Sequence, residues 1–175
     1  TLTMVGANTY ACGTAVKAGT LAVESGASLP ADQFLRVDAD GVLDLGGNSQ
    51  TATALLGTGK VKSGSLAVTE AVYPAGVGTV GTLTLTDVQL TGRVVIDVDA
   101  SGACDKLVVN GTLDASKITF ELADTANLEK AKVLRICEAT SIVGKPSVAN
   151  VPNNFALSMS QTGISISRAG LVFYV

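Results

Sequence analysis

Four oxygen-bearing side chains lie close together in the sequence, and their spacing is similar to the first half of a calcium-binding loop. The segment 97–102 has oxygen ligands at alternate positions and a glycine at the sixth, and a further carboxylate follows. At the twelfth position, where such a loop has a bidentate Glu, stands Val108. The alternative is a strand end that turns into a hydrophilic corner. We predict no metal or cofactor; the calcium candidates are Asp97, Asp99, Ser101 and Asp105.

Histidine is absent from the 175 residues, which removes the commonest general base near neutral pH and every Ser-His or Cys-His pair. Carboxylates such as Asp38 with Asp40, or Asp97 with Asp99, could instead serve a glycan-processing enzyme. The chain has no Trp, three Tyr and four Phe, so few rings could stack on sugars. We predict that the chain is not an enzyme and has no catalytic residues. A glycan-processing enzyme that uses outward carboxylates is the alternative.

Nucleotides and nucleic acids are not expected partners. The segment Gly76–Gly81 satisfies the dinucleotide-binding pattern, but the residues that follow it predict a strand, where that site needs a helix. The 12 basic and 15 acidic residues give a net charge of −3, and the basic residues are scattered. No apolar run approaches the roughly 18 residues that a membrane-spanning helix needs, so no transmembrane segment is predicted.

A short phrase that begins with glycine recurs five times and predicts how these side chains are positioned. After each glycine come a small or β-branched residue, an apolar residue, and then a polar/apolar alternation. The glycines are Gly19, Gly41, Gly64, Gly81 and Gly111. Their spacing is irregular, yet each interval is close to the length of one coil of a β-solenoid. The sequence therefore predicts an all-β fold, a single right-handed parallel β-helix of seven or eight coils.

The glycine phrase fades in the last third of the chain. We expect β-helix coils over residues 1–123 and a β-rich C-terminal cap over residues 124–175, both within one structural domain. The segment Asp124–Lys132 predicts one or two helical turns, since Asp124 or Thr125 can cap them.

The N-terminal segment 1–29 carries a longer pattern of glycines, an Asn-Thr-Tyr triplet and spaced apolar residues. The positions concerned are Leu2, Gly6, Asn8, Thr9, Tyr10, Gly13, Thr14, Val16, Gly19, Leu21 and Val23. At these positions the segment resembles the autotransporter-associated β-strand repeat.

Members of this family are passenger regions of large bacterial surface or secreted proteins that fold as β-helices. The resemblance implies an extracellular or cell-surface location and a structural or adhesive role, without catalytic residues to carry over. It also implies other copies or flanking coils as partners, and host or matrix glycans or proteins as adhesive ones.

Two cysteines lie about one and a half coils apart, which would allow them to meet on adjacent rungs. They are Cys104 and Cys137. An extracellular location favours a disulfide between them, whereas two small buried hydrophobic residues are the alternative. Cys12 has no obvious partner.

Both ends of the sequence contain apolar residues typical of edge strands. Exposed strand edges pair with other chains, so we predict that these ends stack, with copies of the chain assembling end to end into a fibre. The alternative is that the Pro-containing region 145–154 covers the C-terminal end. The assembly residues predicted are Leu2, Met4, Leu171, Phe173 and Tyr174.

Overall fold

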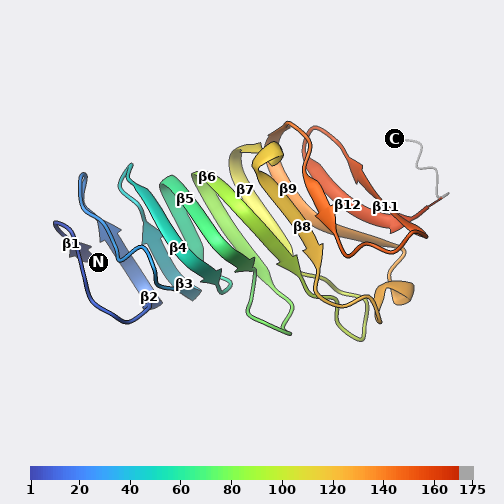
Figure 1. The fold of residues 1–175 in the computed structure, drawn as a ribbon, viewed down its shortest axis with the longest axis horizontal. Helices are drawn as coiled ribbons and strands as arrows, with labels where there is room; N and C mark the ends of the chain where they lie inside the picture. The colour runs from blue at the N-terminus through green and yellow to red at the C-terminus, as the bar shows by residue number, and fades with distance from the viewer. Residues whose placement is uncertain (170–175) are drawn as a thin grey trace.

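The computed structural model describes residues 1–169, which form an all-β fold of twelve strands and two single-turn 3-10 helices (Figure 1). The strands are short to medium in length and are joined by tight corners or by longer loops. They are β1 (Leu2–Met4), β2 (Thr14–Val23), β3 (Leu35–Asp44), β4 (Ser49–Leu56), β5 (Lys60–Tyr73), β6 (Thr82–Ile96), β7 (Lys106–Asp114), β8 (Ile118–Leu122), β9 (Val133–Val143), β10 (Ser147–Ala149), β11 (Phe155–Met159) and β12 (Gly163–Arg168); the 3-10 helices are η1 (Ala115–Lys117) and η2 (Leu128–Lys130).

The strands form one large, mostly parallel sheet whose order follows the chain. Its main path is β1-β2-β3-β4-β5-β6-β7-β9-β12-β11, and β8 joins β6 to β10 beside this path. Pairing is parallel from β1 through β9. The strands therefore succeed one another along the long axis of the molecule, with β1 at one end and β11 and β12 at the other (Figure 1).

Apolar side chains stack in register along this sheet. One ladder pairs in sequence Leu2, Leu21, Leu43, Val61, Leu85 and Val109. A second pairs Leu35, Leu55, Val72, Val94 and Phe120. All members except Leu2 are buried. Because full burial of such a side chain stabilises the fold by about 1.5–3 kcal/mol, the ladders are the main source of stability.

Close approach between neighbouring strands explains why glycine opens the repeated phrase. A Cβ atom on Gly41 would lie 2.2 Å from the carbonyl oxygen of Val16. Gly57, at φ +112, similarly has the carbonyl oxygen of Val37 at 2.1 Å from an added Cβ. Such distances leave no room for a side chain, and the positive φ also favours glycine.

The phrases do not all occupy one position in the stack, contrary to a strict repeat. Gly19 and Gly41 are register partners, whereas Gly64 lies opposite Val88. The reason is that the chain length between equivalent ladder positions varies. The step from Val109 to its partner Ala139 is much longer than the step from Leu43 to Val61, which shifts the later phrases relative to the earlier ones.

The parallel pattern continues past residue 124 and then changes. β9 pairs in parallel with β7, but β12 is antiparallel to β9 and β11 is antiparallel to β12. The predicted helical segment Asp124–Lys132 contains the single turn η2. The division of the chain at residues 123 and 124 stays a prediction.

Candidate functional site

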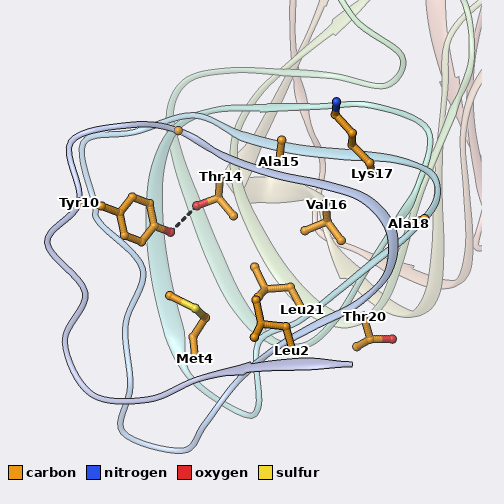
Figure 2. A pocket seen from close by; sticks show the side chains of 11 residues that line it. Leu2, Met4, Tyr10, Thr14, Ala15, Val16, Lys17, Ala18, Thr20 and Leu21 are labelled. Atoms are coloured by element: carbon orange, nitrogen blue, oxygen red, sulfur yellow. Dashed lines mark hydrogen bonds between the residues drawn. The ribbon is translucent and has the colours of Figure 1, made fainter.

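The edge strand β1 lies beside a cavity of about 510 Å³ at the N-terminal end of the stack. Its apolar lining includes Leu2, Met4, Val16 and Leu21, and its polar lining includes Tyr10. Figure 2 shows Met4 and Leu21 side by side within the loop of chain that encloses this space. The cavity exists because β1 has only three residues, so it covers only part of the core beneath it.

A hydroxyl pair forms the polar side of the cavity. Tyr10 Oη and Thr14 Oγ1 lie 2.5 Å apart and share a hydrogen bond (Figure 2). Lys17 is the one charged residue in the lining, which contains no Asp or Glu. A lining of this composition suits apolar side chains with one hydroxyl-rich wall, and provides no carboxylate pair for acid/base chemistry.

The structure describes only part of the predicted assembly set. Leu2 has 64% of its surface exposed, although its register partner Leu21 is buried. Met4 is partly buried and packs against the core. Leu171, Phe173 and Tyr174 lie outside the described residues. The described part of the set therefore forms the N-terminal edge and one wall of the cavity.

The four calcium candidates use their oxygens to accept hydrogen bonds within the chain. Asp105 accepts from the backbone N–H of Gly81 (2.7 Å) and of Asp97 (3.0 Å). Asp97 Oδ2 accepts from the N–H of Gly78. Asp99 Oδ1 accepts from the N–H and the hydroxyl of Ser101 and from the next N–H but one. Within residues 1–169, no three acidic or cysteine side chains are grouped so that they could hold a metal ion.

Asp105 is a buried carboxylate that ties two loops together. Its residue surface is 0% exposed, and the two amides that it binds belong to the loops before β6 and before β7. Burial raises the pKa of its carboxyl group from 3.8 to about 6; the nearby Asp97 also raises it, while the two backbone hydrogen bonds act in the opposite direction. A buried carboxylate held by two amides is typical of a structural clamp.

A third loop packs against this pair. Asn127 Nδ2 donates to the carbonyl oxygen of Val98 at 2.9 Å. Gly102, at φ +87, lies so close to Lys130 that an added Cβ would be 3.2 Å from its carbonyl carbon. The loops 74–81, 97–105 and 123–132 project together beyond one edge of the strands (Figure 1). They form the loop cluster of this protein.

The predicted disulfide bond between Cys104 and Cys137 is wrong, since both are free thiols, as is the exposed Cys12. Cys137 lies opposite Leu107, three residues beyond Cys104 along the strand direction. Three residues correspond to about 10 Å, which exceeds the roughly 7 Å Cα limit for a disulfide. Burial, the main cause, raises the pKa of the Cys104 thiol to about 11 and that of Cys137 to about 12. Neither thiol is activated as a nucleophile.

The carboxylates proposed for the enzyme alternative do not share one cavity. Asp38 accepts a 2.7 Å ion pair from Arg36, and Asp40 is exposed on the same strand. The Gly76–Gly81 loop leads into strand β6, as the sequence predicted, and therefore lacks the helix that a dinucleotide site needs.

Two features of the site escaped sequence reasoning. Tyr10 and Thr14 were matched to a repeat pattern but not to a cavity wall, although two hydroxyls four residues apart around a Gly-containing turn are a recognisable signal. Asp105 was considered only as a metal ligand. Its position directly before a strand of apolar residues indicates a turn-capping role as well.

The chain matches no family model, no curated protein and no solved structure. In residues 1–169, no helix is both long enough and apolar enough to cross a membrane.

Proposed function

We propose that the chain is a non-catalytic, extracellular β-solenoid, a structural or adhesive segment of a bacterial surface or secreted protein. In this proposal the parallel strands wind as a right-handed β-helix, the hand found for nearly all crossovers between parallel strands of one sheet. The observation that carries the proposal is the apolar ladder from Leu2 to Val109, in which six strands contribute one stacked side chain each. A core repeated along one axis suits a spacer or a presenting rod.

The resemblance of the N-terminal residues to the autotransporter-associated β-strand repeat supports the extracellular location. Its glycine phrase coincides with structure at one point, because Gly19 and Gly41 are direct register partners. Partner copies, flanking coils and host or matrix ligands follow from the same resemblance. End-to-end assembly into a fibre belongs to this proposal, and the exposure of Leu2 at the edge strand supports it.

Two observations favour this role over a glycan-processing enzyme. The cavity at the N-terminal end has no acidic side chain in its lining. Asp97 and Asp105 accept backbone hydrogen bonds, which occupies the oxygens that a general acid and base would need.

Antibody labelling of the bacterium that makes the protein tests the location. Antibodies raised against the purified chain should label intact cells or the culture medium. Labelling that requires permeabilised cells would contradict an extracellular role. Incubation of the chain with plant, mucin and bacterial glycans should release no new reducing end or unsaturated product. A product that disappears in Asp38→Asn or Asp97→Asn would establish the enzyme instead.

A further inference from the structure

The outer edge of β1 can accept another strand. Leu2, Thr3 and Met4 pair on one side with Leu21, Ala22 and Val23, and among the described residues no strand pairs with the other side. Unpaired N–H and C=O groups along such an edge are a template for strand addition. The apolar ladder also ends here, on a leucine that is 64% exposed.

A segment with the composition of a strand follows the last described residue, Ala169. Its sequence, Gly-Leu-Val-Phe-Tyr-Val, carries no charge and consists, after the glycine, of apolar, β-branched and aromatic residues that favour strands. In an extended conformation Leu171, Phe173 and Val175 would point to one side. Six residues span about 20 Å when extended.

The distance along the stack decides which copy of the chain this segment can reach. From β1 to β12 the shortest path of paired strands has seven steps, through β2, β3, β5, β6, β7 and β9. At ~4.8 Å per step, the two ends are about 34 Å apart, and Figure 1 places β1 and β12 near opposite ends of the long axis. A reach of about 20 Å from β12 cannot bridge that distance. Only a second copy can supply this segment to β1.

We propose that residues Gly170–Val175 of one copy add as a strand to β1 of a second copy and direct apolar side chains into its N-terminal cavity. The cavity of about 510 Å³ already has Met4, Val16 and Leu21 in its lining. An aromatic side chain such as Phe173 brings about 150–250 Å² of surface to be buried. Backbone hydrogen bonds to β1 supply affinity and the cavity supplies specificity, as in other strand-addition complexes.

This inference rests on the end-to-end assembly of the proposed function and adds which parts of the chain meet. The contact joins two different surfaces, a donor segment and an acceptor edge, so it does not close and produces open chains of copies.

Two variants of the full chain separate donor from acceptor. Leu2→Lys blocks the acceptor edge and leaves the donor, whereas Phe173→Lys blocks the donor and leaves the edge. The control is Val77→Lys, because Val77 is 73% exposed and lies in the loop cluster, away from both partners. Sedimentation velocity over a concentration series measures the mass, and far-UV circular dichroism confirms that each variant is folded.

The unchanged chain and the control should grow in mass with concentration, while each blocked variant alone should stay at 17.6 kDa. An equimolar mixture of the two blocked variants should form a dimer of about 35 kDa, twice 17.6 kDa, and nothing larger, because one live donor meets one live acceptor. If Leu2→Lys does not fold, a synthetic peptide of residues 169–175 with a two-lysine tail replaces it and should shorten the assemblies of the unchanged chain.

Growth of Phe173→Lys with concentration, like that of the unchanged chain, would overturn the donor assignment while leaving end-to-end assembly intact. Two blocked variants that fail to dimerise when mixed would also overturn it. A monomeric unchanged chain at every concentration would remove both the inference and the fibre, and the labelling of intact cells would still test the extracellular role.

Discussion

Replacing Asp105 with Ala should destabilise the chain severely, because one buried side chain accepts hydrogen bonds from two loops. Its carboxylate accepts from the N–H groups of Gly81 and Asp97 at 2.7 and 3.0 Å, and the residue is 0% exposed. Alanine offers no acceptor, and the tight surroundings of the two loops leave both amides without their partner. The loss therefore falls on the backbone of two segments at once.

The magnitude follows from the number of amides left unsatisfied. Each buried N–H without an acceptor costs about 1–3 kcal/mol, so two cost about 2–6 kcal/mol. Removing a carboxylate whose pKa is raised to about 6 returns part of this cost, since that carboxylate is unfavourably buried. We expect a net loss of about 2–4 kcal/mol in the free energy of unfolding at pH 7.5. For a chain of this size the corresponding fall in Tm is roughly 5–15 °C.

Thermal unfolding followed by circular dichroism measures this loss. The matched control is Asp40→Ala, which removes an exposed carboxylate and should leave Tm within about 2 °C of the unchanged chain. Asp105→Asn keeps one acceptor oxygen and should fall between the two. A Tm for Asp105→Ala equal to that of the Asp40 control would refute the clamp, since two orphaned amides cannot be without cost.

Three further outcomes are expected. Because the folded chain raises the pKa of Asp105 from 3.8 to about 6, it binds more protons than the unfolded chain between these values; the contribution of Asp105 to stability should therefore fall as pH rises from about 4 to about 6, and the Tm difference between the unchanged chain and Asp105→Asn across this window measures it. Leu85→Ala should cost about 2–5 kcal/mol in urea unfolding, whereas Thr84→Ala on the outward side should cost far less; equal costs would mean that the ladder is not the core. Iodoacetamide at pH 7.5 should label the exposed Cys12 in the folded chain and Cys137 only after unfolding, as mass spectrometry of peptides would reveal.

The sequence predicted the fold class because local alternation and glycine placement carry it. Leu21 and Val23 alternate with polar or small residues, as do Leu43 and Leu45, and all four are buried. Where the prediction separated Thr14–Lys17 from Thr20–Val23, the structure has one strand, β2, with a register shift between Val16 and Ala18. The backbone stays extended through that corner, which a pattern of side chains alone does not reveal.

Register is what the sequence could not supply. The distance between Cys104 and Cys137 depends on which residue of β7 faces Cys137, and the partner is Leu107. The sequence spacing of the two cysteines is compatible with several registers, because the steps along the ladder differ widely in length. The same variation displaced Gly64 from the position of Gly41. The cavity at β1 was equally hidden, since it depends on how little of the core three residues can cover.

The variation in step length also indicates where a ligand would bind if the chain is adhesive. The ladder keeps one side chain from each strand in register although its later steps are longer than its earlier ones, so the additional residues lie outside the core. They contribute to the loops 74–81, 97–105 and 123–132, which pack on one another through Asn127 and Gly102 and are tied at their base by Asp105. In stacked architectures, insertions mapped to one face are commonly the binding face, because the core tolerates no such change. Val77, 73% exposed at the tip of the first of these loops, is an apolar side chain that the core does not need. The stack and the loop cluster can therefore change independently, which allows one rod to present different ligand-binding loops.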